Sequence, residues 1–190
     1  MIDEVSEKIK KCLPNAKKKY QVHEPCFDRK STQHVNKCIN SNYVSSYGDY
    51  IDKFSNKLQK ITNAKYVLLT NSGTSALFLA LKLLNIEDTE VLVPTMTFVA
   101  TVNSIIYNNA IPHFIDCEKD SLNIDINKLT SYMSENFIMK GNKCFNKKSK
   151  KYIKCIIGVH AYGMPMDSRG LKKICRQYNI ESIEDAAGAL

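Results

Sequence analysis

The sequence contains no tryptophan, no CxxC pair of cysteines and no apolar run long enough to cross a membrane. A membrane-spanning helix needs about 20 consecutive apolar residues, and the apolar runs of this chain are far shorter. The first residues, MIDEVSEKIKK, have the spacing of an amphipathic helix rather than of a signal peptide. We therefore expect a cytoplasmic protein with no membrane partner.

The Walker loop and the GxGxxG fingerprint are also missing, so ATP and NAD are not predicted as ligands. Seven cysteines are present, and this odd number argues against a complete disulfide framework. Reduced thiols in a cytosolic protein fit this cysteine content best. We predict no metal site.

Basic residues outnumber acidic residues by 27 to 19, which gives a formal net charge of +8. Much of this excess lies in two lysine clusters, at residues 17–19 and 140–154. Few aromatic residues interleave with the lysines and no nucleic-acid motif accompanies them, so we predict a solvated surface and no nucleic-acid partner. Within the second cluster, residues 140–152 are expected to form a hairpin or a mobile loop.

Residues 66–84, YVLLTNSGTSALFLALKLL, join a strand pattern to a helix pattern through a polar turn. The apolar, partly β-branched run at 66–69 predicts a buried strand. From Ala76 to Leu84 only Lys82 is polar, so this helix is expected to lie sandwiched inside a core.

The turn between these two elements has the composition of a phosphate site. Gly73 permits a close backbone approach, and the start of a helix favours an anion by about 0.3 to 1 kcal/mol. We interpret Gly73, Thr74 and Ser75 as phosphate-binding residues. Simple capping of the helix by Ser72 or Thr74 explains the same residues equally well.

Apolar periodicity predicts an α/β fold, a mostly parallel sheet with helices on both faces. Strands are expected at 65–69, 90–93, 111–115, 153–159 and 180–184, and helices at 74–85, 97–108, 125–137 and 167–178. Three earlier helices are expected near residues 5–12, 31–40 and 50–61. We divide the chain into a helical N-terminal segment, residues 1–62, and the first part of an α/β domain, residues 63–190.

Ligands of parallel sheets bind at the carboxyl ends of the strands. Besides the phosphate turn, this pole is expected to carry Phe98, His160 and Asp185. Each has an ordinary alternative, since Phe98 could be a core residue, His160 a satisfied turn histidine and Asp185 a helix cap. Together they fit a flat, phosphorylated ring that bears a nitrogen, which is the shape of pyridoxal phosphate. A carboxylate beside that nitrogen favours its protonated form by about 1 to 3 pKa units and keeps the ring an electron sink.

Four segments in order, NSGTSAL (71–77), VPTMTFVATVNSI (93–105), HAYGMPMD (160–167) and IEDAAGAL (183–190), resemble the DegT/DnrJ family of sugar aminotransferases. The resemblance extends upstream through NYVSSYGDYIDKF (42–54) and covers roughly residues 20–190. The lysine-rich insertion is similar to the branch that acts in legionaminic-acid-type sugar synthesis. The resemblance implies the N-terminal part of a fold-type-I pyridoxal phosphate transferase, whose large domain is incomplete in this chain.

The same resemblance implies residue roles and partners. Thr74 and Ser75 would hold the cofactor phosphate, Phe98 would stack on the pyridine ring, and Asp185 would pair with the ring nitrogen. Asn103 and His160 would line the site. A homodimer is implied, with a nucleotide-linked keto sugar and an amino donor such as glutamate as partners.

Two positions depart from the family pattern. Gly188 stands where many members have Gln, His or Glu after EDAA. The Schiff-base lysine of the family lies downstream of that motif, so no catalytic lysine is assigned within the 190 residues. We accordingly expect this chain to be inactive on its own.

The resemblance therefore implies pyridoxal phosphate-dependent transfer of an amino group, from glutamate, to a 4-keto nucleotide-linked deoxysugar. Relatives in which histidine replaces the Schiff-base lysine dehydrate sugars, and dehydration remains an alternative. A truncated remnant without catalysis is a further alternative.

Overall fold

The computed structural model describes residues 2–12 and 25–189, and the lysine cluster at 17–19 lies outside them. The chain divides into two compact units, and the division along the sequence falls between Val67 and Leu68. Each unit is described by itself below. The predicted division into residues 1–62 and 63–190 stays a prediction. No helix of the described residues is long and apolar enough to span a membrane.

The first unit consists of helices α1 (Ile2–Cys12), α2 (Arg29–Asn40) and α3 (Asp49–Thr62), which confirms the three predicted N-terminal helices. Asp28 caps α2, because its carboxylate accepts a hydrogen bond from the Ser31 backbone N–H at 2.7 Å. Hydrogen bonds from the Ser31 side chain and backbone hold the pKa of Asp28 below its ordinary value. At the other end, α3 stops where Asn63 takes a left-handed conformation.

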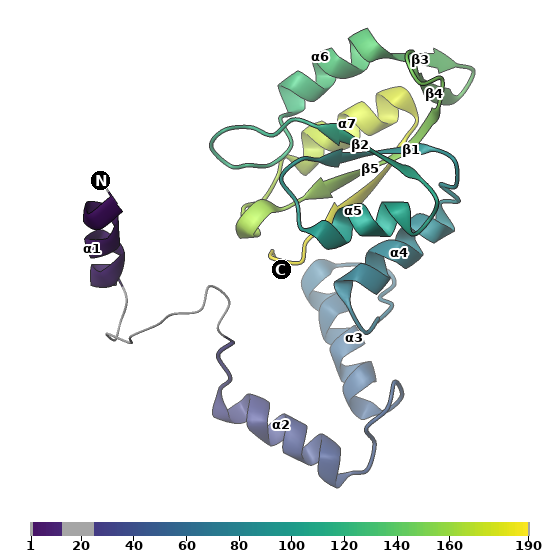
Figure 1. The fold of residues 1–190 in the computed structure, drawn as a ribbon. Coiled ribbons are helices and arrows are strands. Elements are labelled where there is room, and N and C mark those ends of the chain that lie inside the picture. Colours follow the sequence, from purple (N-terminus) through teal and green to yellow (C-terminus); the bar gives the residue numbers. More distant parts are fainter. Residues whose placement is uncertain (1, 13–24, 190) are drawn as a thin grey trace. The chain divides into compact units, whose positions relative to one another are not determined.

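The second unit is built on a six-stranded sheet (Figure 1). Strands β1 (Glu90–Pro94), β2 (Ile111–Ile115), β5 (Tyr152–Val159) and β6 (Glu181–Asp185) are parallel, which confirms four of the five predicted strands. Strands β3 (Phe137–Lys140) and β4 (Lys143–Asn146) form an antiparallel hairpin. The lysine-rich segment thus begins as a hairpin, one of its two predicted forms.

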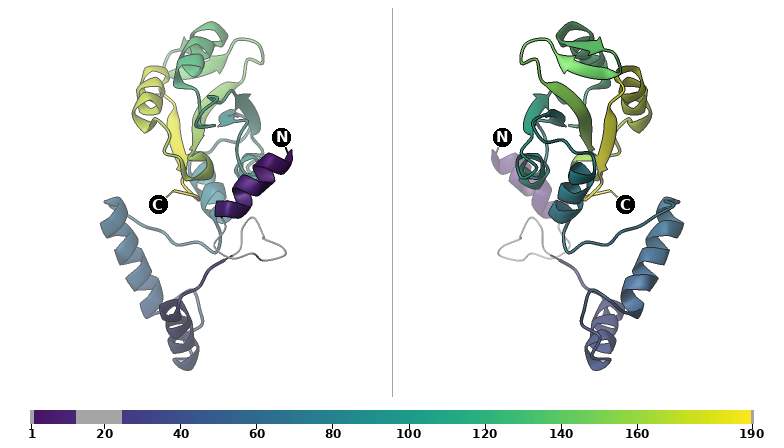
Figure 2. Two further views of the ribbon diagram at one scale, coloured as in Figure 1. Left: turned by 90° about the vertical axis from the view of Figure 1, so that its left-hand side faces the viewer. Right: turned by 90° about the vertical axis from the view of Figure 1, so that its right-hand side faces the viewer.

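Helices cover both faces of this sheet, as predicted. Figures 1 and 2 show α4 (Gly73–Leu83) and α5 (Val99–Ile106) on one face, and α6 (Ile126–Asn136) and α7 (Ser168–Tyr178) on the other. Successive residues of a strand point to opposite faces, so each face has its own core. Val91, Val93, Cys155 and Ile157 pack with Leu81 and Ile105 under α4 and α5. Leu92 and Ile156 pack with Leu129, Met133, Leu171 and Ile174 under α6 and α7.

The predicted strand at residues 65–69 is wrong. These residues are non-helical backbone without a strand, and none of the six described strands pairs with them. Tyr66 and Leu68 are 78% and 79% exposed. A short apolar run becomes a strand only when a neighbour completes its hydrogen-bond ladder, and no such neighbour is present among the described strands.

Helix α4 is also less enclosed than its composition predicts. Leu77 and Leu81 are buried, but Leu79 and Leu83 are 40% and 80% exposed. Residues two apart lie on opposite sides of a helix, so only one side of α4 packs on the sheet. Burial on all sides, which the sequence predicted, is therefore not observed.

Candidate active site

The carboxyl ends of the parallel strands lie together at one pole of the second unit. Strand registers pair Pro94 with Ile115 and Val159 with Asp185, so β1 ends beside β2 and β5 ends beside β6. Phe98 follows β1, His160 follows β5, and Asp185 is the last residue of β6. This pole is where the sequence placed its candidate residues.

Asp185 is the last residue of β6 and is half-buried. Its Oδ2 atom accepts a hydrogen bond from Thr101 Oγ1 at 2.8 Å, and Oδ1 accepts one from the Ala187 N–H at 3.2 Å. Residues 186–189 form a turn, so Asp185 caps no helix among the described residues. A carboxylate has about four lone-pair positions, so two contacts leave acceptor capacity for a further donor.

Thr101 and Thr97 adjoin Asp185 in the structure, and neither was predicted from the sequence. Thr101 is fully buried in the first turn of α5, and its hydroxyl accepts a hydrogen bond from Thr97 Oγ1 at 2.8 Å. The spacing of four residues at the start of a predicted helix was the available signal, since such residues share a face. Which partner that face meets depended on the fold.

Phe98 occupies the N-cap position of α5 and is 76% exposed. The alternative that Phe98 is a core residue is therefore wrong. The neighbouring residue Thr97 donates a hydrogen bond to Thr101, and Thr101 donates one to the Asp185 carboxylate. The backbone that carries the Phe98 ring is therefore linked to Asp185. An exposed aromatic ring held at one end of a helix can stack on a planar ligand.

The N-terminus of α4 provides backbone donors. Ser72 caps this helix by accepting the Ser75 N–H at 3.1 Å, and the Ser72 carbonyl accepts the Ala76 N–H. These bonds leave the N–H groups of Gly73 and Thr74, the first two of the helix, for an outside acceptor. A Cβ built on Gly73 would meet nothing within 4 Å, so the space above the helix end is open.

The direction of α4 places that N-terminus toward the carboxyl pole. Asn85, just past the helix, accepts a hydrogen bond from Lys154 near the start of β5 at 3.0 Å, so α4 ends at the amino pole of the sheet. The Asn108 side chain, just past the end of α5, donates to the Phe78 carbonyl of α4 at 3.2 Å. Both helices therefore run away from the carboxyl pole. Lys154 itself therefore lies at the pole opposite to the candidate site.

His160 is a satisfied turn histidine. Its Nδ1 atom accepts the Met166 N–H at 3.2 Å, and its Nε2 atom lies 3.3 Å from Glu184 Oε2. Glu184 also accepts a hydrogen bond from Ser168 and forms an ion pair with Lys172. His160 contributes to the site through its backbone, because its N–H donates to the Asp185 carbonyl at 3.1 Å.

Asn103 is the candidate that is least well placed. It is half-buried on α5, two residues beyond Thr101, and so lies about 200° around the helix from the residue that contacts Asp185. Thr101 thus contacts both the Asp185 carboxylate and the Phe98 carbonyl, whereas Asn103 lies on another side of the same helix.

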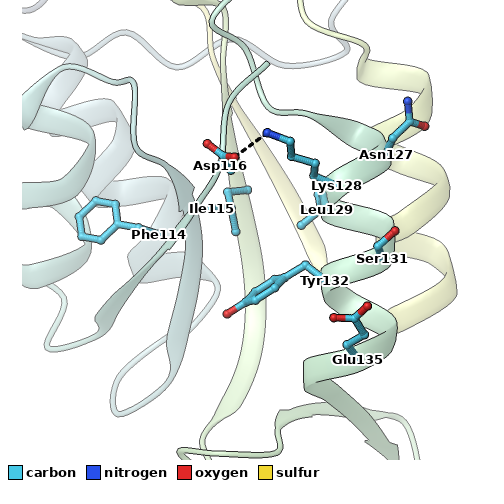
Figure 3. A pocket seen from close by; sticks show the side chains of 9 residues that line it. All are labelled: Phe114, Ile115, Asp116, Asn127, Lys128, Leu129, Ser131, Tyr132 and Glu135. Carbon is cyan, nitrogen blue, oxygen red and sulfur yellow. Dashed lines mark hydrogen bonds and ion pairs between the residues drawn. The ribbon is translucent and has the colours of Figure 1, made fainter. Parts of the chain in front are cut away.

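A separate groove of about 630 Å³ lies between β2 and α6 (Figure 3). Tyr132 and Glu135 project from α6, and Lys128 forms an ion pair with Asp116 at 2.7 Å. The hydrogen bond from Lys128 holds the pKa of Asp116 below its ordinary value. None of the predicted cofactor-binding residues lines this groove, which belongs to the other face of the sheet.

Comparison with known proteins agrees with this fold and these motifs. Residues 25–190 match the sequence profile of the DegT/DnrJ/EryC1/StrS aminotransferase family. The chain is 34% identical over 170 residues to a GDP-perosamine synthase of Vibrio cholerae, and 35% identical over 169 residues to one of Escherichia coli O157:H7. These matches cover 89% and 88% of the chain but only 42% of each relative. The chain therefore spans about two-fifths of the length of these relatives.

Solved structures show the same fold. An aminotransferase from Psychrobacter cryohalolentis superposes with a TM-score of 0.70 at 26% identity, over 87% of this chain and 38% of that one. A GDP-4-keto-6-deoxymannose-3-dehydratase superposes with a TM-score of 0.73 at 20% identity, over 90% of this chain and 42% of that one. At this lower identity the likeness concerns the fold alone.

Proposed function

The chain belongs to the DegT/DnrJ/EryC1/StrS aminotransferase family, and we propose that it binds pyridoxal phosphate for the transfer of an amino group to a nucleotide-linked sugar. In full, the proposed reaction moves the amino group from glutamate to a 4-keto nucleotide-linked deoxysugar. The observation that carries the proposal is the half-buried carboxylate of Asp185 at the end of β6. Hydrogen bonds through Thr101 and Thr97 connect this carboxylate to the backbone next to the exposed Phe98.

The residues at the carboxyl pole fit the cofactor. The N–H groups of Gly73 and Thr74 and the Ser75 hydroxyl are donors for its phosphate, and the open space above Gly73 leaves room for that group. The Phe98 ring is exposed and available for stacking. Asp185 has acceptor capacity beyond its two observed contacts.

When bound, pyridoxal phosphate supplies a ring that withdraws electrons from the carbon bearing the amino group. The residues of this chain bind and orient that ring. The N-terminus of α4 would hold the phosphate, and stacking on Phe98 would fix the orientation of the ring. Asp185 would keep a proton on the ring nitrogen. In this proposal Asn103 and His160 also line the cofactor site.

The substrate class is supported by the relatives. Two relatives at 34% and 35% identity are named as GDP-perosamine synthases, and a third, at 28%, as a dTDP-4-amino-4,6-dideoxy-D-glucose transaminase. These names favour a nucleotide-linked sugar as the acceptor. Glutamate as donor and a homodimer as the assembly are further parts of the proposal.

Cofactor binding is tested with pyridoxamine phosphate, which carries the same ring and phosphate but needs no lysine. Titration by calorimetry is expected to show saturable binding, and Asp185→Asn is expected to weaken it about tenfold or more, because the ring nitrogen loses its charged partner. Asp116→Asn is the matched control, since it removes a carboxylate that follows β2 outside the site. Equal affinities for all three proteins would remove Asp185 from the site.

The transfer reaction is tested in a protein extended to the length of its relatives, with a nucleotide-linked 4-keto sugar and glutamate. Equal amounts of amino sugar and 2-oxoglutarate are expected. A deoxygenated sugar without an amino group would instead support the dehydratase alternative. Absence of both products would support the non-catalytic alternative.

A further inference from the structure

The buried hydroxyl of Thr101 connects two segments that lie 84 residues apart in the sequence. Thr101 is 0% exposed, and its Oγ1 atom lies 2.8 Å from Asp185 Oδ2 and 2.8 Å from Thr97 Oγ1. An ionised carboxylate only accepts hydrogen bonds, and a hydroxyl carries a single proton. The direction is therefore set: Thr97 donates to Thr101, and Thr101 donates to Asp185.

This arrangement controls the orientation of the carboxylate. A free aspartate rotates broadly about its terminal torsion. Here Thr101 donates to one carboxylate oxygen and the Ala187 N–H donates to the other. These two hydrogen bonds restrict rotation of the carboxylate. Thr101 is itself stiff, because a β-branched residue in a helix has few side-chain rotamers.

The same two hydroxyls connect the carboxylate to the backbone that carries Phe98. Thr97 directly precedes Phe98, and the Thr101 N–H donates to the Phe98 carbonyl at 3.0 Å. One turn of backbone therefore carries the ring and the donor that orients Asp185. A shift of α5 along its axis would move both groups together.

We propose that Thr101 is a positioning residue that aims the Asp185 carboxylate at the nitrogen of a ring lying on Phe98. The inference rests on the proposed function, since it assumes that a pyridine ring occupies this place. Thr97 supports Thr101 by occupying its lone pair, which directs the Thr101 proton to Asp185. Thr101 is fully buried, so in this proposal it acts on the ring only through Asp185.

The test uses the whole chain and pyridoxamine phosphate, with two readouts. Calorimetry gives the dissociation constant, and the circular dichroism of the bound ring reports its orientation in the site. Thr101→Val keeps the shape of the side chain and removes the hydroxyl, whereas Thr101→Ser keeps the hydroxyl. Ser104→Ala is the matched control, because it removes another fully buried hydroxyl of α5, which bonds to the Thr101 carbonyl and not to Asp185.

We expect Thr101→Val to weaken binding about tenfold, a change of about 1.4 kcal/mol, and to alter the dichroism of the bound ring at saturation. Thr101→Ser is expected to restore the affinity to within about twofold together with the wild-type dichroism. Ser104→Ala is expected to match the wild type in both readouts. Thr97→Val, which leaves Thr101 in place, is expected to weaken binding about threefold and provides a second variant if Thr101→Val fails to fold.

Several results would overturn the inference. Wild-type affinity and dichroism in Thr101→Val, or in Thr97→Val where only that variant folds, would show that the hydroxyls do not aim Asp185. Equal weakening by Thr101→Val and Ser104→Ala would indicate loss of helix packing instead of positioning. If Asp185→Asn still weakens binding in these cases, the proposed function stands without the inference; if the wild type shows no saturable binding, both fail.

Discussion

Gly163 and Gly188 pack backbone against backbone at the carboxyl pole. A Cβ atom built on Gly163 would lie 2.7 Å from the Gly188 carbonyl oxygen, and one built on Gly188 would lie 3.2 Å from the Gly163 nitrogen. These two residues belong to the turns that follow β5 and β6. The close approach holds the His160 turn against the residues that follow Asp185.

Gly163→Ala is expected to destabilise the protein by about 2 to 3 kcal/mol, because Gly163 has a φ of +82° and its new methyl group would press on backbone. Thermal and urea unfolding measure this loss. Gly141→Ala is the matched control, since Gly141 also has a positive φ of +58° but has nothing within 4 Å of its Cβ position. Equal losses in the two variants would contradict the close approach of Gly163 to Gly188.

Phe98→Ala is expected to weaken pyridoxamine phosphate binding about fivefold to tenfold without lowering stability. The ring is 76% exposed, so its removal costs little packing, whereas a stacked pair of rings contributes about 0.5 to 1.5 kcal/mol. Calorimetric titration and thermal unfolding measure the two effects. Phe114→Ala removes a ring of 50% exposure from β2, outside the site, and is expected to leave binding unchanged. A similar affinity for wild type and Phe98→Ala would exclude stacking.

Native thiols are expected to react with iodoacetamide in two classes. Burial raises the pKa of Cys155 to about 12 and the pKa values of Cys144 and Cys175 to about 11, so these thiols stay protonated and shielded at pH 8. Cys12 and Cys26 are exposed and should be modified first. Mass spectrometry of peptides gives the order, and denatured protein, in which every cysteine should react, is the control. Rapid native modification of Cys155 would contradict its burial.

The same three thiols predict a loss of stability at alkaline pH. In the unfolded chain they ionise around their ordinary pKa of 9.0, but in the native state they keep their protons up to about pH 11 or 12. Above pH 9 the unfolded state therefore binds fewer protons than the native state, so the free energy of unfolding falls as pH rises. Their contribution is fully present below pH 9. Urea unfolding between pH 8 and pH 11 measures the slope, and Cys155→Ala should make it shallower.

The 190-residue chain is expected to hold pyridoxal phosphate without forming a specific bond to any lysine. Lys154 lies at the amino pole of the sheet, with its ammonium group donating to the Asn85 carbonyl, and Lys65 is exposed and belongs to no strand. Reduction with borohydride followed by peptide mapping should find scattered, substoichiometric labels on surface lysines. Stoichiometric labelling of a single lysine, together with conversion of a keto sugar, would overturn this expectation.

Local elements of the fold were determined by the sequence itself. The helix predicted at 167–178 forms as α7; Asp167 caps it by accepting the Gly170 N–H at 2.9 Å, and Asn179 ends it in a left-handed conformation. The alternation of apolar runs likewise predicted four parallel strands and their covering helices. These features depend on residues within about four positions of one another, where capping and periodicity act.

Tertiary structure decided which of these elements meet. Sequence periodicity could not show that Thr101 contacts Asp185, that Phe98 stays exposed, or that His160 pairs with Glu184. The run at 65–69 has the composition of a strand, yet it remains without one because strand formation requires a paired neighbour. Contacts between distant segments depend on strand order and register, and these arise only when the whole domain packs.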